Sequence, residues 1–379
     1  MDLTIVCKQL KSKTVTIPPS KSLSHRAVIC ASLSKHACKI NNLGDSVDIA
    51  ASTKGINTIV KQKKEIIDCH ESGSTLRFLL PIAAVSGKEF EFTGSARLME
   101  RSLSVYDEIF AQKKVKFIKK NGKITIKGPL EPGIFKIRGD ISSQFITGLL
   151  FSLPLLNGDS EIIITTKLES RDYVILTIDV LKKFGIKITK TKNGFKIKGN
   201  QEYISNNYTV EGDYSQAAFF LVANYLGGKY KITGMNEKSN QGDRAIVDIL
   251  KKVKNNHGKG IIVDASNIPD LVPILTLLMC FLNGKSKIIN AGRLRDKESD
   301  RLDAICTELN KIGGKITQTK DGLIIQGISS LTGGIVETWN DHRIAMTLGI
   351  ATLKCTKPLT IKNTEVVKKS YPNFWKDLL

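Results

Sequence analysis

The chain has 379 residues, a formal net charge of +21 and 41% hydrophobic residues. This length is too great for one ordinary hydrophobic core, so we expect two or three domains. The longest apolar run, residues 271–282, is too short to span a bilayer. The first residues lack the apolar core and cleavage site of a signal peptide, and we therefore expect a cytoplasmic protein with no membrane segment.

The positive charge is compatible with nucleic acid, a membrane surface or small anions as partners, and also with a lysine-rich surface that binds nothing. Lysines are spread through predicted hairpins, and only 6% of the residues are aromatic, which disfavours a nucleic-acid interface. Seven scattered cysteines and five histidines without paired spacing predict neither a disulfide framework nor a metal site. Glycine-rich nucleotide-binding motifs are absent from the sequence.

One pattern occurs six times along the chain: a polar stretch that suits a helix cap, then an apolar run of helix length. We expect these apolar helices to begin near residues 20, 73, 141, 213, 270 and 341. A β-rich segment follows each run, and amphipathic helices are predicted most clearly at 171–185 and 300–314. Hairpins with Asn-Gly or Asp-Gly turns are predicted at 116–128, 187–199 and 315–327.

The repeated unit is therefore β-α-β-α-β-β, with one buried apolar helix and one half-exposed amphipathic helix. Six units fit an α/β (α+β) fold of two pseudo-threefold domains, three units each. The first and fourth units are short and lack a full hairpin. The sixth unit runs out at Leu379, so we expect the N-terminal strand, residues 3–10, to complete it. One domain then comprises residues 1–17 plus 212–379, and the other comprises residues 18–211.

Helix starts carry free N–H groups and a partial positive charge, so six of them suggest a site for a multiply charged anion. Lys21, Ser22 and Arg26 on the first turns of one helix could hold a phosphate or a carboxylate, or could simply be a capped start with solvated charges. Another helix start carries three neutral hydrogen-bond donors, for which helix capping is slightly favoured over anion binding. These donors are Ser142, Ser143 and Gln144.

Asp270 precedes an apolar run as a natural N-cap, and among cationic groups it could also act as a general base. Lys297, Glu298 and Arg301 open an amphipathic helix, where acids suit the helix dipole and also suit proton transfer beside a bound anion. Of the histidines, only His342 looks placed near a site.

Arginines near the helix starts stand out because the chain is otherwise lysine-biased. They suggest fork-shaped recognition of planar anions, with surface ion pairs as the alternative. They are Arg77, Arg97, Arg101, Arg295, Arg301 and Arg343.

Ten segments together resemble the enolpyruvyl transferases, in that family's order and along nearly the whole chain. They are PPSKSLSHRA, ESGSTLRFL, GSARLMERSL, GDISSQFITGLL, ESRDY, GDYSQAA, IPDLVP, LRDKESDRL, NDHRIAM and KKSYPNF. The resemblance implies two domains of three β-α-β-α-β-β units, with the active site in the cleft between them. It also implies transfer of the enolpyruvyl group of phosphoenolpyruvate to the 5-hydroxyl of shikimate 3-phosphate, on the way to chorismate and aromatic amino acids.

The implied reaction passes through a tetrahedral intermediate and releases phosphate. The resemblance implies no metal and no organic cofactor, and it gives the two small substrates as partners, with neither nucleic acid nor membrane. We expect a monomer.

By the resemblance, Asp270 would take the 5-hydroxyl proton, Glu298 would handle the proton at the methylene carbon, and Lys21 would face both substrates. The implied shikimate 3-phosphate ligands are Lys21, Ser22, Arg26, Ser142, Ser143, Gln144, Ser170, Tyr173, Asp270 and Lys297. The implied phosphoenolpyruvate ligands are Lys21, Gly73, Arg97, Gln144, Arg301, Arg343 and Lys369.

Three positions depart from the family pattern: Glu71 replaces a common Asn, Ser74 replaces the usual Thr, and Arg293 stands where Asn is frequent. Two rival functions are an enolpyruvyl transferase acting on UDP-N-acetylglucosamine and a basic RNA-binding protein. The first usually has a reactive Cys in the loop that here reads TGSARLMERS. The second is opposed by acidic residues such as Asp270 and Glu298 placed among the basic loops.

Overall fold

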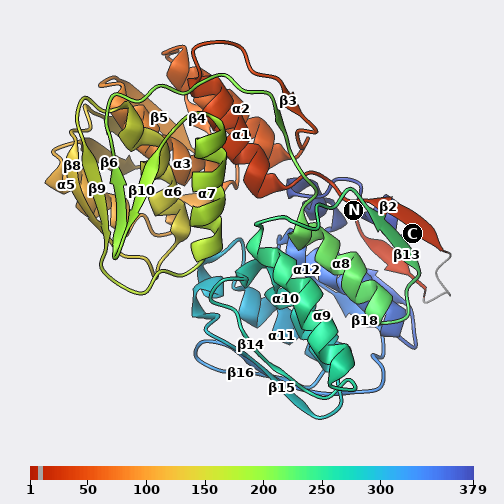
Figure 1. Cartoon of the computed structure of the whole chain (residues 1–379). Helices are drawn as coiled ribbons and strands as arrows, with labels where there is room; N and C mark the ends of the chain where they lie inside the picture. The colour runs from red at the N-terminus through yellow and green to blue at the C-terminus, as the bar shows by residue number, and fades with distance from the viewer. Residues whose placement is uncertain (7–11) are drawn as a thin grey trace. The chain divides into compact units, whose positions relative to one another are not determined.

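The computed structural model describes residues 1–6 and 12–379. The chain divides into two compact units. Residues 19–211 form one, called here the central unit, and residues 1–18 with 212–379 form the other, called the terminal unit. Each unit encloses its own hydrophobic core. In Figure 1 the central unit runs from red through yellow to green, and most of the terminal unit is green to blue.

The central unit contains seven α-helices and ten strands. Its helices are α1 (Lys21–Leu33), α2 (Val47–Val60), α3 (Gly73–Val85), α4 (Ala96–Glu100), α5 (Ser104–Gln112), α6 (Ser143–Ser152) and α7 (Arg171–Lys183). Its strands are β3 (Ile40–Asn41), β4 (Ile67–Asp68), β5 (Glu89–Thr93), β6 (Lys116–Lys120), β7 (Lys123–Lys127), β8 (Gly133–Ile137), β9 (Ser160–Ile164), β10 (Ile188–Thr191), β11 (Gly194–Ile197) and β12 (Tyr208–Thr209).

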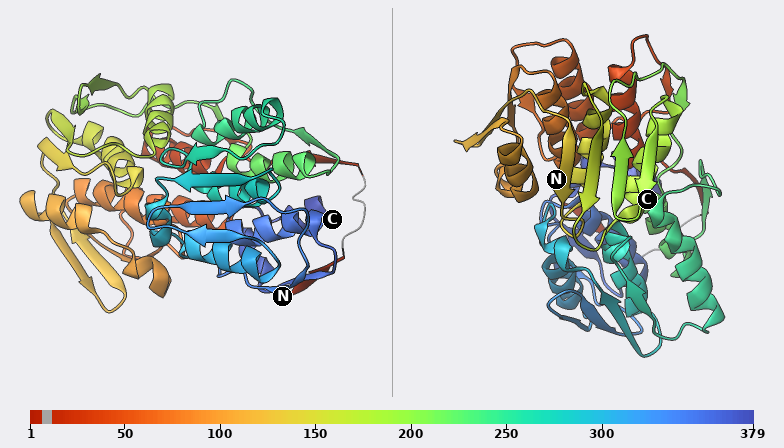
Figure 2. Two further views of the ribbon diagram at one scale, coloured as in Figure 1. Left: turned by 90° about the horizontal axis from the view of Figure 1, so that it is seen from below. Right: turned by 60° about the vertical axis from the view of Figure 1, so that its left-hand side comes forward.

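These strands form two four-stranded sheets, in the orders β4-β5-β7-β6 and β10-β11-β9-β8, and the short pair β12-β3. Each four-stranded sheet combines one parallel pair with antiparallel neighbours. The right-hand view of Figure 2 shows β8 to β11, yellow to green, side by side.

The described part of the terminal unit has six α-helices and nine strands. The helices are α8 (Tyr214–Tyr225), α9 (Ala245–Asn255), α10 (Val272–Cys280), α11 (Arg301–Lys311), α12 (His342–Ala351) and α13 (Phe374–Leu378). The strands are β1 (Leu3–Ile5), β2 (Lys13–Thr16), β13 (Tyr230–Thr233), β14 (Ile262–Asp264), β15 (Lys285–Ile289), β16 (Ile316–Gln318), β17 (Leu323–Gln326), β18 (Gly334–Val336) and β19 (Leu359–Ile361). Three of its 3₁₀ helices carry predicted site residues or adjoin them: η3 (Pro269–Leu271), η4 (Gly292–Asp296) and η6 (Thr364–Lys369).

The terminal unit has sheets in the orders β14-β15-β17-β16 and β1-β19-β18, and the pair β13-β2. The left-hand view of Figure 2 shows cyan and blue strands of this unit side by side. The predicted N-terminal strand does join the end of the chain, because Leu3 pairs antiparallel with Ile361. Its later part, residues 7–10, and Cys7 lie outside the described residues. The first and fourth of the six predicted β-α-β-α-β-β segments have no four-stranded sheet in the described structure. Their strands form only the two short pairs, β3 with β12 and β2 with β13.

The three predicted hairpins are confirmed as β6–β7, β10–β11 and β16–β17. In the first, Asn121 and Gly122 both have positive φ (51° and 69°), as an Asn-Gly hairpin turn requires. In the second, Thr191 pairs with Gly194, so the turn residues are Lys192 and Asn193. The predicted Asn-Gly turn is therefore shifted by one residue there.

Side-chain caps explain why five of the six apolar helices begin where they do. Ser20, Ser72, Ser142, Asp213 and Asp341 each accept a backbone N–H from the first turn of α1, α3, α6, α8 and α12. Each cap satisfies one N–H that has no partner within its helix. The sixth helix, α10, begins without a side-chain cap.

The apolar helices form the cores. Every residue of α10 is buried, which is what an all-apolar helix predicts. In the central unit α3 and α6 approach closely at Gly148, where a Cβ would lie 2.4 Å from the Arg77 carbonyl oxygen. No larger side chain could occupy that point without moving the helices apart. This packing sets the polar helix starts of each unit in fixed positions.

Candidate active site

In the terminal unit, one buried guanidinium gathers three carboxylates. Arg301, the first residue of α11, is 1% exposed. Its Nε lies 2.8 Å from Oδ2 of Asp341, its Nη1 lies 2.9 Å from Oδ1 of Asp270, and its Nη2 lies 2.8 Å from Oε2 of Glu298. A charge this deeply buried is tolerated only when it is paired and hydrogen-bonded. Arg301 therefore fixes the two predicted proton-transfer residues, Asp270 and Glu298, relative to each other.

Asp270 also pairs with a second arginine. Its Oδ2 lies 2.9 Å from Nη2 of Arg343. The same Nη2 also donates to the Ser215 hydroxyl (3.1 Å), and Nη1 of Arg343 donates to the backbone carbonyl of Asp270 (3.2 Å). Asp270 lies in η3 and does not cap α10. The capping interpretation of Asp270 is therefore wrong: its carboxylate is drawn to two arginines from distant parts of the chain.

The electrostatics of this cluster keep Asp270 ionised. Burial raises the pKa of Asp270, but the charges of Arg343, Lys297 and Arg301 outweigh burial and the opposing charge of Glu298, and the net shift is well below the ordinary value. Asp270 is therefore ionised at neutral pH, the form that a general base requires, but the low pKa makes it a weak base. Its basicity would rise if the arginine charges were neutralised by a bound anion.

Lys369 and Arg293 reach carbonyl oxygens of the same unit. Lys369, the last residue of η6, donates from Nζ to the carbonyl oxygen of Asn340 at 2.6 Å. Arg293, one of the departures from the family pattern, donates from Nη2 to the Ser266 carbonyl at 2.5 Å. Both residues thus help to order loops that border helix starts.

In the central unit, a chain of buried hydroxyls links the starts of three helices. The Ser72 hydroxyl accepts from Thr75 (2.7 Å), the Thr75 and Ser52 hydroxyls are 2.7 Å apart, and the Ser52 hydroxyl is 2.7 Å from Nδ1 of His25. These residues belong to α1, α2 and α3 or to a cap. These hydrogen bonds tie α1, α2 and α3 together, and they leave Nε2 of His25 without a partner among the described residues.

Lys21 lies at the start of α1 and forms an ion pair with Asp48 of α2, with Nζ 2.9 Å from Oδ2. Both side chains are largely buried, at 18% and 10% exposure. The start of α1 therefore presents a lysine whose position is set by a neighbouring helix.

Arg26 is held by the protein on all three of its nitrogens. Nε donates to Thr177 Oγ1 (2.9 Å), Nη1 to the Ser22 carbonyl (2.6 Å) and Nη2 to the Tyr173 carbonyl (2.9 Å). Burial lowers the pKa of Arg26 to about 10. Arg26 thus ties α1 to α7, and near it the buried Ser170 stands before α7 with a positive φ of 51°.

The donors at the start of α6 form a second bonded group. Ser142 accepts the backbone N–H of Gln144, and Ser143 is buried. The side-chain amide of Gln144 accepts from Arg77 Nη1 (2.8 Å) and donates to the Ser74 hydroxyl (2.9 Å). The departure to Ser at position 74 thus keeps a hydroxyl at this point of α3.

Arg101 is not among the ligands that the family resemblance implies. A Cβ added at Gly73 would lie 2.8 Å from Nη1 of Arg101 and 3.3 Å from Nη1 of Arg77, so both guanidiniums border the start of α3. Arg101 is buried, and its Nε has no hydrogen-bond partner among residues 1–6 and 12–379, whereas Arg97 is exposed on α4. Both were noted as arginines near helix starts, but sequence spacing could not tell which of them turns toward Gly73. Glu71, the third departure, is half-buried two residues before Gly73.

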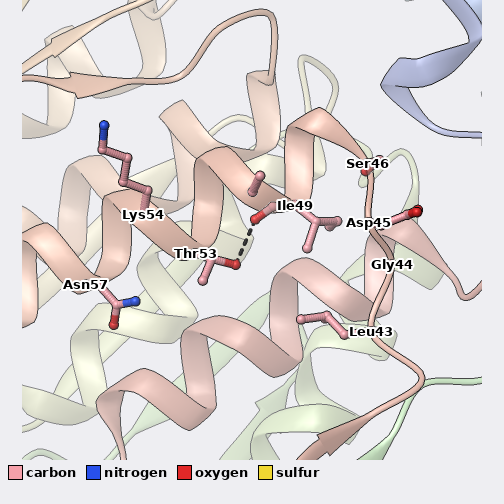
Figure 3. A pocket seen from close by; sticks show the side chains of 9 residues that line it. Leu43, Gly44, Asp45, Ser46, Ile49, Thr53, Lys54 and Asn57 are labelled. Carbon is pink, nitrogen blue, oxygen red and sulfur yellow. Dashed lines mark hydrogen bonds between the residues drawn. The ribbon is translucent and has the colours of Figure 1, made fainter. Parts of the chain in front are cut away.

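One hollow of about 370 Å³ lies against α2 and the loop before it. Figure 3 shows its lining from Leu43 to Asn57, with the Thr53 hydroxyl bonded to the Ile49 carbonyl. None of the predicted ligands lines this hollow.

Within residues 1–6 and 12–379, no three His, Cys, Asp or Glu side chains gather as metal ligands would. The helices in the same part of the chain include none that is long and apolar enough to cross a membrane.

Comparison with known proteins gives consistent matches over nearly the whole chain. The family model for EPSP synthase (3-phosphoshikimate 1-carboxyvinyltransferase) matches residues 8–378. A protein named 3-phosphoshikimate 1-carboxyvinyltransferase from Clostridium novyi (strain NT) is 48% identical over 406 residues, covering 96% of this chain and 93% of the relative. The protein of the same name from Clostridioides difficile (strain 630) is 45% identical over 412 residues, covering 97% and 94%.

The solved structure of EPSP synthase from Acinetobacter baumannii matches with a TM-score of 0.80 at 20% identity, covering 99% of this chain and 97% of that one. At this identity the likeness speaks for the fold alone. It confirms the predicted fold class.

Proposed function

Because the chain belongs to the EPSP synthase family of 3-phosphoshikimate 1-carboxyvinyltransferases, we propose that it transfers the enolpyruvyl group of phosphoenolpyruvate to the 5-hydroxyl of shikimate 3-phosphate and releases phosphate. The observation that carries this proposal is the family match over residues 8–378, together with 48% identity across 96% of the chain. The family assignment also confirms the prediction of a transferase of the shikimate pathway.

In the proposed first step, the 5-hydroxyl oxygen bonds to C2 of phosphoenolpyruvate while Asp270 accepts the hydroxyl proton. Glu298 supplies a proton to the methylene carbon, which gives a tetrahedral intermediate. In the second step Glu298 takes a proton back from the resulting methyl group, the bond from C2 to the phosphate oxygen breaks, and the leaving phosphate takes the proton that Asp270 accepted, so both carboxyl groups return to their starting states. The shared pairing of both carboxylates with Arg301 supports these roles because it holds them in one geometry.

The state of Asp270 fits this order of events. Burial raises the pKa of Asp270, but the charges of Arg343, Lys297 and Arg301 hold it below its ordinary value. Both substrates are anions, and an anion bound at Arg343 would offset its charge and raise the proton affinity of Asp270. The base would then gain strength when the substrate to be deprotonated is bound.

The proposed substrate ligands are those that the resemblance implies, with one addition. For shikimate 3-phosphate they are Lys21, Ser22, Arg26, Ser142, Ser143, Gln144, Ser170, Tyr173, Asp270 and Lys297. For phosphoenolpyruvate they are Lys21, Gly73, Arg97, Gln144, Arg301, Arg343 and Lys369. We add Arg101, because its buried guanidinium borders Gly73 and a helix start, which together favour an anion. The ligands come from both units, and we propose that both units act on one pair of substrates; the monomeric state and the cytoplasmic location stay predictions.

The test is phosphate release by the purified protein with phosphoenolpyruvate, with and without shikimate 3-phosphate. Release should depend on shikimate 3-phosphate, and Asp270→Asn and Glu298→Gln should each lower kcat by roughly 10²- to 10⁴-fold. Asp248→Asn, which changes an exposed carboxylate on α9, serves as the matched control and should leave kcat unchanged. Release that requires UDP-N-acetylglucosamine instead, or no release at all, would overturn the proposal.

A further inference from the structure

The turn that leads into α12 has an unusual backbone. Trp339 and Asn340 have φ values of 53° and 54°, and the Asp341 N–H donates to the Thr338 carbonyl at 2.9 Å. A two-residue turn with both φ values positive normally holds Asn-Gly or Asp-Gly. A bulky residue such as Trp is costly in this region, and such strain persists only when surrounding contacts impose it.

The contacts that impose it come from Glu308 of α11, whose side chain is fully buried. Its Oε1 accepts the indole N–H of Trp339 at 2.6 Å, and its Oε2 accepts the backbone N–H of Glu337 at 2.9 Å. Lys311, one turn later on α11, balances the charge with Nζ 2.8 Å from Oε1. Hydrogen bonds to an ionised carboxylate are strong. This carboxylate binds the indole of Trp339 within the turn and the backbone of Glu337 just before it.

The same turn connects to three cationic residues of the candidate site, to Arg301 and Lys369 through their side chains and to Arg343 through its backbone N–H. Asp341, directly after it, accepts from Arg301 Nε (2.8 Å) and caps α12 by accepting the Arg343 N–H (2.9 Å). The carbonyl oxygen of Asn340 accepts from Lys369 Nζ at 2.6 Å. Arg301, Arg343 and Lys369 are all proposed phosphoenolpyruvate ligands. The described structure thus joins each of them, through one hydrogen bond, to the turn that Glu308 holds.

We propose that Glu308 is a positioning residue for phosphoenolpyruvate binding: it holds the Trp339–Asn340 turn in its strained form and so sets Arg301, Arg343 and Lys369. This inference rests on the proposed function. Glu308 touches none of these three cations in the described hydrogen bonds and ion pairs, so its effect on binding passes through the turn.

The test compares Michaelis constants for the two substrates. Glu308→Gln keeps the shape of the side chain, but its amide NH₂ would face one of the two N–H donors. We expect the KM for phosphoenolpyruvate to rise roughly 10- to 100-fold, because small misplacements of binding groups have effects of this size. The KM for shikimate 3-phosphate should change by less than about threefold, since most of its proposed ligands lie in the central unit. A general loss of structure would instead affect both constants or the folded fraction.

Two further variants separate the turn from the charge. Trp339→Phe removes the indole donor and should raise the same KM, and combining it with Glu308→Gln should add little because both act on one turn. Lys311→Met is the matched control, because it removes the ammonium group that pairs with Glu308 and changes no residue of the turn. The lysine side chain is 45% exposed, so this variant should change either KM by less than about threefold.

A measurement that does not depend on activity is the ¹H–¹⁵N spectrum of the two tryptophan indoles. The signal lost in Trp339→Phe should move further in Glu308→Gln than in Lys311→Met, because Lys311→Met leaves the accepting carboxylate oxygen in place. An active wild-type protein with an unchanged phosphoenolpyruvate KM in Glu308→Gln would overturn this inference and leave the proposed function standing. A wild-type protein without turnover would overturn both, and an unmoved indole signal would overturn the inference at its first step.

Discussion

Arg97 and Arg101 lie four residues apart, and the fold gives them different surroundings. Arg97 is exposed on α4, whereas Arg101 directly follows that helix and is 6% exposed beside Gly73. A buried guanidinium next to a helix start is better suited to hold an anion than an exposed one, because the surrounding protein weakens screening by water. The difference between the two arginines can therefore be measured as a difference in substrate affinity.

We expect Arg101→Ala to raise the KM for phosphoenolpyruvate by roughly 30- to 100-fold, the usual effect of losing a hydrogen bond to a charged group. Arg97 is also a proposed ligand, but its exposed charge is screened by water, so Arg97→Ala should raise the same KM by less, about threefold or below. Steady-state kinetics at fixed, saturating shikimate 3-phosphate would measure both variants. The reverse order of effects would favour Arg97, the residue that the family motif implies.

His25 adds a pH dependence at the same scale. It is buried, and its Nδ1 is 2.7 Å from the Ser52 hydroxyl. Burial, reinforced by the charges of Lys21 and Arg26, lowers the pKa of His25 well below its ordinary value. The unfolded chain takes up a proton near pH 6.5 that the folded chain does not, so this contribution to stability is complete above pH 6.5 and falls as the pH falls.

Between pH 7 and pH 5 this histidine should lower the free energy of unfolding by about 2 kcal/mol. His25→Gln should remove that part of the pH dependence, although it will also lower stability at pH 7 because the buried network is disturbed. Urea unfolding followed by circular dichroism at several pH values would measure it. His36→Gln, at an exposed position, is the control; an equal change of slope in both variants would contradict the assignment to His25.

At the scale of the element, two aspartates that cap helices of the terminal unit differ in burial and in their ion pairs. Asp341 caps α12 and is fully buried against Arg301, whereas Asp300 caps α11 with its side chain 32% exposed and pairs with Arg295. Both remove one unsatisfied N–H from a helix start. Only Asp341 also balances a buried charge.

Asp341→Asn should therefore lower the free energy of unfolding by about 3–5 kcal/mol, the range for breaking a buried ion pair. Asp300→Asn should cost about 1 kcal/mol or less, since Asn also caps helices and the lost pair is partly exposed. Chemical denaturation followed by tryptophan fluorescence would compare them, because both tryptophans lie in the terminal unit. Similar costs for the two variants would show that the buried pairing adds little to the cap.

The difference between local signals and long-range contacts explains which elements and site residues the sequence could predict. The apolar helix starts and the hairpins depend on local signals, such as Ser72 before α3 or the Asn121-Gly122 turn. The pairing of Asp270 with Arg301 and Arg343 joins residues 31 and 73 positions apart. The residues next to Asp270 in the sequence do not distinguish this long-range pairing from an ordinary N-cap, which is why the capping interpretation of Asp270 is wrong. Glu308 was also missed, because its residue type fits an ordinary position on an amphipathic helix.

At the scale of the whole molecule, the two units have separate cores with matching parts. Leu149 on α6 and Leu277 on α10 are both fully buried, one in each core. Because each core is enclosed within its own unit, removing side-chain volume from one should weaken that unit first. Tryptophan fluorescence reports on the terminal unit alone, whereas circular dichroism reports on both.

Leu277→Ala should lower the stability of the terminal unit by about 2–5 kcal/mol and shift the fluorescence transition in urea by roughly 1 M or more. Leu149→Ala should shift part of the circular dichroism transition to lower urea and leave the fluorescence midpoint in place. Each variant is thus the control for the other, since the same atoms are deleted at equivalent depth. If Leu149→Ala moved the fluorescence midpoint as far as Leu277→Ala does, the two cores would be unfolding as one cooperative body, and separate stabilities could not be assigned to the halves of the substrate-binding machinery.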